Sequence, residues 1–312
     1  MVIYYKSVEG NLYMYICIRK DDFIMKKIIN KDNINVVVHG GCFHADDVAC
    51  VALLKIMHKE VNVSRKFKVD PESENADFVL DIGRMDKVTE DQVFLDHHQG
   101  VELIDGTEVK HCAFSKLVDL MIDPNEKLFK KHLFNMLVLP VAAQDNGQNG
   151  SELGLFPSPL TFVNAMGLSW KDDQRLSDQR FAEVVEMAVV VIKNIIKTIK
   201  DKIEAINGVN HALNRAEGGV MTLSRFLPWT DTVVEYNDGF PKIKLVVFPN
   251  NRGGVTLQVV PKKIGSFESW LKIPEGIIDF EGCTGQAHGA FAFFDHMDDA
   301  IAAGRKLIKV SI

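Results

Sequence analysis

The chain has 312 residues, of which 46% are hydrophobic and 25% charged, a composition typical of a soluble globular protein with one large domain or two ordinary ones. Its net charge of −6 argues against a protein that coats nucleic acid through a broadly positive surface, but it leaves open a nuclease whose acidic site binds divalent cations. No apolar run approaches the roughly 20 residues of a membrane span, and the five cysteines without C-x-x-C spacing indicate reduced thiols rather than a structural zinc site.

Residues 1–34 form an N-terminal extension whose role the sequence does not indicate. Charged residues interrupt its apolar stretches, which argues against a secretory signal. The segment Leu12–Ile18 predicts a β-strand, and Met25 is a candidate internal start of the chain. We expect the protein in the cytoplasm, with an organelle as the alternative, and not in a membrane.

Three short apolar runs in residues 35–100 each end in a potential metal ligand, and each predicts a buried strand. They are Val36–Val38 before His39, Phe78–Leu80 before Asp81, and Val93–Leu95 before Asp96-His97-His98. The residues between and after them predict helices at 48–57, 112–122 and 127–145, with Pro140 kinking or dividing the last. Strands interleaved with helices favour an α/β fold with a parallel sheet.

The second half of the chain begins with one long predicted helix. Apolar residues recur at helical spacing from Gln179 to Asn207, and we place the domain boundary just after this helix, between residues 35–210 and 211–312. The smaller domain predicts three strands, a turn at Asn250–Gly254 and an amphipathic helix from Asp295 to Ile308. The predicted strands are Val220–Leu223, Ile243–Phe248 and Val255–Val260. This pattern is typical of a small α+β domain.

Six side chains of the first domain form a candidate metal site, because ligands collect at the carboxyl edge of a parallel sheet. They are His39, His44, Asp46, Asp81, His97 and Asp145. Three imidazoles and three carboxylates suit Mn²⁺ or Zn²⁺ better than Mg²⁺ or Ca²⁺. Six ligands are too many for one tetrahedral ion and fit two ions that share a bridging carboxylate.

The same residues follow the order of motifs in the DHH phosphoesterase superfamily, which includes RecJ nucleases, oligoribonucleases and family II pyrophosphatases. The segments His39–Asp47 and Val79–Gly83 resemble more closely the Myg branch of that superfamily, the metal-dependent 3′→5′ exonucleases. The C-terminal segments 258–261 and 266–269, and Gly282-Cys283 followed by His288, are similar to Myg features as well. DHH relatives usually have Asp where His44 stands, and the imidazole makes the site less anionic.

The resemblance implies a DHH-like parallel-sheet catalytic domain with a smaller α+β C-terminal domain. It implies one ion held by His39, His44 and Asp81, and a second held by Asp46, Asp81, His97 and Asp145, so that Asp81 bridges them. The two divalent ions are expected to be Mn²⁺, with Mg²⁺ or Zn²⁺ as alternatives, and a water between them would attack phosphorus in line.

Two catalytic residues and a substrate-binding group are also implied. His98 would face the substrate phosphate or steer a proton, and Asp96 would orient an imidazole. The smaller domain would bind substrate through Arg252, Gly253, Gly254 and His288.

The leading hypothesis is therefore a two-metal 3′→5′ exonuclease that acts on RNA or DNA ends. A second hypothesis is a small-molecule phosphohydrolase acting on pyrophosphate, a cyclic dinucleotide or a bisphosphorylated nucleotide, because the same metal core serves both. The third is a non-catalytic, metal-stabilised binding protein.

Overall fold

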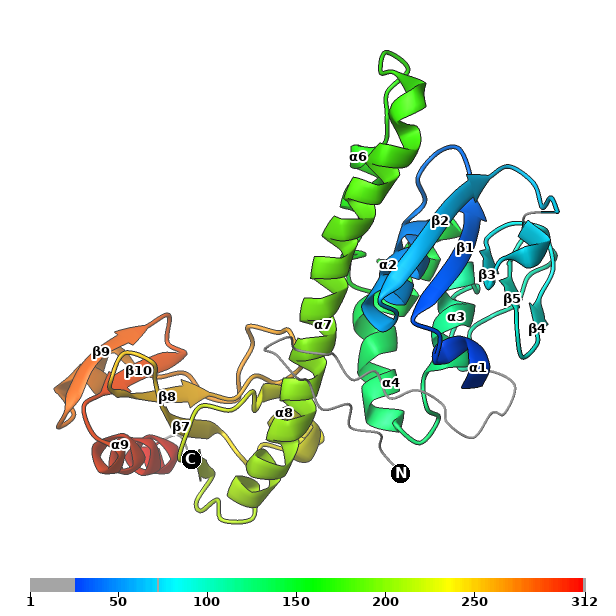
Figure 1. Cartoon of the computed structure of the whole chain (residues 1–312). Helices are drawn as coiled ribbons and strands as arrows, with labels where there is room; N and C mark the ends of the chain where they lie inside the picture. Colours follow the sequence, from blue (N-terminus) through cyan, green and yellow to red (C-terminus); the bar gives the residue numbers. More distant parts are fainter. Residues whose placement is uncertain (1–25, 72, 311–312) are drawn as a thin grey trace. The chain divides into compact units, whose positions relative to one another are not determined.

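The computed structural model describes residues 26–71 and 73–310 (Figure 1). The strand predicted at Leu12–Ile18 lies outside these residues. The chain divides into two compact units, residues 1–199 and 200–312. The long helix α7 (Ser177–Leu213) contributes to both, so the division falls within the helix, whereas the boundary predicted from the sequence lies after residue 210.

The first unit is built on a five-stranded sheet with the order β2-β1-β3-β5-β4, which can be followed across Figure 1. The strands β2, β1, β3 and β5 run parallel, and only the short edge strand β4 runs antiparallel to its neighbour. The bounds are β1 Asn33–His39, β2 Glu60–Lys66, β3 Phe78–Leu80, β4 Lys87–Val88 and β5 Val93–Leu95. The predicted α/β class is confirmed. The edge strand β2 was not predicted, because its exposed polar residues break up the apolar pattern.

The register of the parallel strands places their ends at one edge. Val38 pairs with Leu80, and Leu80 pairs with Leu95. Continuing this register brings His39, at the end of β1, beside Asp81 and Asp96, which directly follow β3 and β5, so these three residues lie at one edge of the sheet. The strands are buried on both faces, which explains why they are uninterrupted apolar runs in the sequence.

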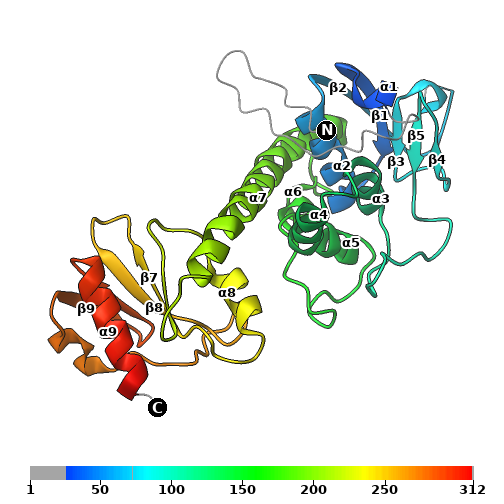
Figure 2. The same cartoon turned by 90° about the horizontal axis from the view of Figure 1, so that it is seen from below.

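Helices contact this sheet and complete the first unit. α2 contacts β1 and β2, and α3 contacts β5; both lie on the same side of the sheet in Figure 2. The bounds are α1 Lys26–Ile29, α2 Ala45–Met57, α3 Ala113–Met121, α4 Lys127–Leu133, α5 Leu139–Asp145 and α6 Phe162–Met166, with short 3₁₀ turns η1 Ser73–Asn75 and η3 Gln174–Leu176.

The helix predicted over residues 127–145 is divided as expected, although the irregularity lies just before the proline. One π-helical turn, η2 (Phe134–Val138), separates α4 from α5, and Pro140 stands at the start of α5. Proline lacks the N–H that a regular helix requires, and a π-turn accommodates that loss. The helix then continues to Asp145.

The second unit holds a five-stranded mixed sheet with the order β6-β7-β8-β10-β9. β6 and β7 are parallel, and the other neighbours are antiparallel. The bounds are β6 Val220–Thr222, β7 Leu245–Pro249, β8 Val255–Val259, β9 Cys283–Ala287, β10 Phe291–Phe294, α8 Thr230–Asn237, η4 Glu275–Asp279 and α9 Met297–Val310. β9, β10 and α8 were not predicted.

Alternate residues of β7 pack into two hydrophobic cores, one on each face of the sheet. Leu245 and Val247 pack with the residues of α9 on one face, while Val246 and Phe248 pack with Trp229 and the end of α7 on the other. No helix within residues 26–71 and 73–310 combines the length and the apolar character needed to cross a membrane.

Candidate metal centre

The first ligand segment is the turn between β1 and α2. β1 ends at His39, and Gly40 lies so close to β2 that a Cβ on it would come within 3.2 Å of the Lys66 carbonyl group. His44 is the N-cap of α2, and its side chain makes no capping hydrogen bond. The His44 ring therefore remains available to bind a metal ion. It stacks on the His39 ring with centroids 5.4 Å apart.

A buried arginine holds this turn in place. The Nη2 of Arg65, at the end of β2, donates to the carbonyl of Gly41 at 2.7 Å, and its Nη1 donates to the hydroxyl of Ser177 at 2.8 Å. Its guanidinium also lies over the rings of Phe43 and Phe181, 4.9 and 4.6 Å from the centroids. Arg65 thus ties the turn to the first residues of α7.

Two adjacent aspartates begin α2 and are both fully buried. The backbone N–H of Asp47 donates to Oδ1 of Asp46 at 2.8 Å. The other oxygen of Asp46 and both oxygens of Asp47 accept no hydrogen bond. Burial, together with the carboxylate of Asp81, raises the pKa of Asp46 to about 6, and burial with the charge of Asp46 raises the pKa of Asp47 well above its ordinary value.

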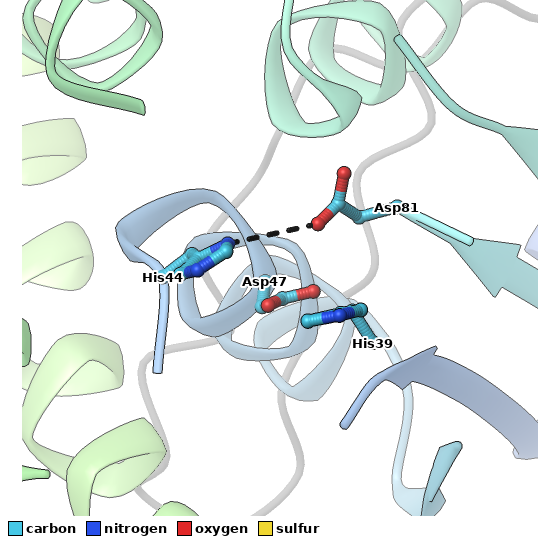
Figure 3. A group of neighbouring side chains, drawn as sticks. All are labelled: His39, His44, Asp47 and Asp81. Atoms are coloured by element: carbon cyan, nitrogen blue, oxygen red, sulfur yellow. Dashed lines mark ion pairs between the residues drawn. The ribbon is translucent and has the colours of Figure 1, made fainter. Parts of the chain in front are cut away.

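Asp81 lies close to His39, His44 and Asp47, and Figure 3 shows these four side chains with the contact between His44 and Asp81 marked. Asp81 follows β3 with a φ of 58°, a left-handed conformation that non-glycine residues seldom adopt, although Asp tolerates it better than most. The side chain is almost fully buried, and neither oxygen accepts a hydrogen bond. Oδ2 lies 4.0 Å from Nδ1 of His44, and Oδ1 lies 3.2 Å from Nε2 of His97.

The segment after β5 is held by its own aspartate. Oδ1 of the buried Asp96 accepts from the backbone N–H of His97 at 2.6 Å and of His98 at 3.0 Å, and lies 2.7 Å from the ring Nδ1 of His98. Oδ2 accepts from the N–H of Arg84 at 2.6 Å. Burial alone would raise the pKa of Asp96, but these hydrogen bonds lower it on balance. Asp96 therefore fixes the backbone at both histidines and the orientation of the His98 ring.

Asp145, at the end of α5, completes the cluster from the helical side. Its Oδ2 lies 3.2 Å from Nε2 of His97 but accepts no hydrogen bond. Burial and the carboxylate of Asp46 raise the pKa of Asp145 to about 9. Burial lowers the pKa of His97, yet the carboxylates of Asp81 and Asp46 more than offset this and raise it overall.

The structure brings together all six residues predicted as metal ligands, since their candidate ligand atoms fall into three overlapping groups. The groups are His39, His44, Asp47 and Asp81; Asp81, His97 and His98; and His44, Asp46 and Asp145, each within 4.8 Å. Asp81 belongs to two of them, which is the position a bridging carboxylate would take. Sequence reasoning missed Asp47; its only signal was a second acidic residue in the first turn of the helix.

The donor set fits a metal. Seven of the twelve buried side-chain atoms that lack a hydrogen-bond partner in the described residues belong to this cluster: Nδ1 of His39, Oδ2 of Asp46, both oxygens of Asp47, both of Asp81 and Oδ2 of Asp145. A buried carboxylate without hydrogen-bond partners destabilises the folded state by roughly several kcal/mol per charge, the desolvation penalty of an uncompensated buried ion. Divalent cations would remove that penalty.

A pocket of about 340 Å³ opens beside the two histidines. It is lined by His97, His98, Lys110, His111 and Lys116, among others. The Nζ of Lys116 contacts Asp86 at 2.6 Å and the carbonyl of Asp96 at 2.9 Å, so its charge is compensated. No ion pair within the described residues involves Lys110, which leaves one available cationic group in this pocket.

The predicted substrate-binding residues of the second unit do not come together. Arg252, Gly253 and Gly254 form the turn before β8, whereas His288 lies in the turn between β9 and β10. Gly254 lies against the Phe294 carbonyl, at the end of β10, and the other end of β8 bonds Ala290, next to the His288 turn. The two turns therefore stand at opposite ends of one sheet.

The model of the MYG1_exonuc family, described as an uncharacterised protein family (UPF0160), matches residues 35–285. The chain is 22% identical over 277 residues to the MYG1 protein of Dictyostelium discoideum, a match that covers 78% of this chain and 83% of that protein.

Two solved structures are similar at a low level. The pGpG-specific phosphodiesterase PggH from Vibrio cholerae is 14% identical with a TM-score of 0.29, over 89% of this chain and 98% of that one. An uncharacterised protein from Helicobacter pylori G27 is 12% identical with a TM-score of 0.28, over 89% and 99%. TM-scores this low establish no shared fold.

Proposed function

The chain belongs to the MYG1_exonuc family, and from that premise and the metal centre we propose that it is a two-metal-dependent phosphodiesterase, acting as a 3′→5′ exonuclease on RNA or DNA. The observation that carries the proposal is the buried Asp81, whose unpaired oxygens lie between two groups of imidazoles and carboxylates. The family name supports phosphodiester hydrolysis, and the carboxylate-imidazole set supports metal dependence.

When bound, two divalent ions supply Lewis acidity, which lowers the pKa of coordinated water and offsets the negative charge of a phosphate. His39, His44, Asp47 and Asp81 would hold one ion. Asp46, Asp81, His97 and Asp145 would hold the other. Mn²⁺ suits these mixed nitrogen and oxygen ligands best, with Mg²⁺ or Zn²⁺ as alternatives.

The chain's own residues would orient the substrate. His98 is half-exposed toward the pocket, and Asp96 fixes its ring, so it can donate to a phosphate oxygen or to a leaving oxygen. Lys110 lines the same pocket and can bind a second phosphate oxygen.

The decisive experiment uses the purified chain with Mn²⁺ and single strands labelled at one end or the other. A 3′→5′ exonuclease shortens a 5′-labelled strand progressively, and Asp81→Asn abolishes this. Asp105→Asn, an exposed residue outside the site, serves as the control and should retain activity. Intact substrate with every divalent metal tried would contradict the proposal.

One observation favours a small-molecule phosphohydrolase as the second candidate. The pocket beside His98, at about 340 Å³, is close to the size of a single small ligand. Release of phosphate from pyrophosphate, or cleavage of a cyclic dinucleotide, without any degradation of oligonucleotides would support this alternative.

A further inference from the structure

A second pocket, of about 820 Å³, lies entirely within the second unit. Its lining is rich in phenylalanine and also contains the turn that precedes β8. Phe226, Phe248, Phe291 and Phe293 supply the aromatic rings, and Arg252 supplies a cation. None of these residues belongs to the metal centre.

The sheet register explains why two of these rings are uncovered. On β10, Phe291 and Phe293 point to the face opposite Ala292 and Phe294, which are buried in the core with α9. Their neighbours across β9 are Ala287 and Gly285. These small residues leave the faces of the two rings accessible, and both Phe side chains are only partly buried.

A third ring extends this surface. Phe226 is 54% exposed and packs edge-on against Phe248, with ring centroids 5.4 Å apart. A contiguous group of partly exposed aromatic rings leaves apolar area in contact with water, and in monomeric proteins such patches tend to mark binding sites. Such a group beside polar residues is typical of a ligand-binding surface.

Polar groups surround the rings. The Asn250 side chain accepts from the backbone N–H of Arg252 at 2.9 Å and fixes the turn, while no ion pair within the described residues engages the Arg252 guanidinium. Gln258, Thr284 and Asp295 also line the pocket and offer hydrogen-bond donors and acceptors. The carboxylate of Asp295 suits the amino group of a base rather than a phosphate.

We propose that this pocket binds a nucleotide, with its base stacked on Phe293, Phe291 or Phe226 and its phosphate on Arg252. A base has the flat apolar faces that the rings require and the polar edge that Gln258 and Asp295 can bind. A guanidinium without a carboxylate partner binds phosphate with two hydrogen bonds. The inference rests on the proposed function for the identity of the ligand, and it favours nucleic acid over pyrophosphate as the substrate class.

The test measures fluorescence anisotropy of a labelled single-stranded oligonucleotide with the full chain in EDTA, where no hydrolysis occurs. Phe226→Ala and Phe293→Leu should each weaken binding about 5- to 100-fold, and Arg252→Gln should weaken it and reduce its salt dependence. The matched controls are Phe240→Ala, 74% exposed in the same unit but outside the pocket, and the exposed Arg215→Gln. Both controls should bind like the unaltered chain.

Competitors identify the ligand. If a nucleoside monophosphate displaces the labelled oligonucleotide at a similar concentration, the pocket binds free nucleotides. If only oligonucleotides displace it, the pocket binds a nucleotide within a nucleic-acid strand. Either result supports the proposal. Displacement by inorganic phosphate alone, equal affinity for an abasic strand, or unchanged affinity of the Phe variants would overturn the proposal. Absence of hydrolysis with Mn²⁺ would contradict the proposed function but would not affect the binding measured in EDTA.

Discussion

The Nε2 atom of His97 lies 3.2 Å from Oδ1 of Asp81, yet that oxygen accepts no hydrogen bond. The same nitrogen lies 3.2 Å from Oδ2 of Asp145, which is equally without a hydrogen bond. Close contacts between ligand-type atoms that are not aligned as donor and acceptor are expected where these atoms surround a common cation. The relationship between His97 and Asp81 is therefore the strongest geometric support for a metal centre.

Replacing Asp81 by Asn tests this relationship through stability. Without metal, Asp81→Asn should raise the melting temperature, because it removes a buried charge that no group in the described residues hydrogen-bonds. With saturating Mn²⁺ the order should reverse, since metal at 100 times its Kd stabilises the unaltered chain by about 2.7 kcal/mol. Thermal unfolding with EDTA or Mn²⁺ measures both. A variant that is less stable in EDTA would contradict the account.

Stability of the metal-free chain should fall as pH rises. The pKa of Asp46 is raised to about 6 and that of Asp145 to about 9, both above the value of an unfolded aspartate. The folded chain therefore binds more protons than the unfolded chain, and its stabilisation is complete below about pH 4 and is lost as pH rises through the folded-state values.

Metal binding should show the opposite dependence on pH, because ligands must lose their protons. Stabilisation by Mn²⁺ should therefore grow between pH 5 and 8, while the EDTA curve declines. Melting temperatures across this range, with and without Mn²⁺, check both directions. Parallel curves would argue against carboxylates as the ligands.

Asp96→Asn should reduce activity by about 10- to 100-fold while the metal content stays close to normal. The Asn side chain has one accepting oxygen where Asp96 has two. It therefore cannot accept both from the N–H of Arg84 and from His97 and His98, and one of these sets of hydrogen bonds is lost. Initial rates together with metal analysis separate this effect from loss of a ligand. Loss of both ions would place Asp96 among the ligands instead.

Arg65→Lys should destabilise the chain by about 1–3 kcal/mol and weaken metal binding. Lysine has a single nitrogen in place of the two that donate to Gly41 and Ser177, and it has no plane that can stack on the rings of Phe43 and Phe181. Denaturant unfolding and Mn²⁺ titration measure the two effects. Arg175→Lys, at a side chain 89% exposed, is the matched control and should change neither.

The strands that carry ligands were predictable because both of their faces are buried. A strand of this kind is a continuous apolar run, so the position of His39, Asp81 or Asp96 at its end can be read from the sequence. The edge strand β2 has no such run, so the role of Arg65 in supporting the turn between β1 and α2 could not be predicted from the sequence.

The remaining differences involve long-range packing. Asp47 resembles an ordinary helix-start residue, and only the buried position of α2 turns its side chain into the cluster. Arg252 and His288 lie beside glycines in similar turns, so their local sequences look alike. Their separation follows from the pairing of β8 with β10, and β10 was not predicted.

Metal quantification on the purified chain is the most direct test of a two-ion centre at Asp81. After equilibration with Mn²⁺ and removal of excess metal, we expect about two ions per chain for the unaltered protein and for Asp105→Asn, and a loss of both for Asp81→Asn. One ion or none, or two ions retained by Asp81→Asn, would contradict such a centre.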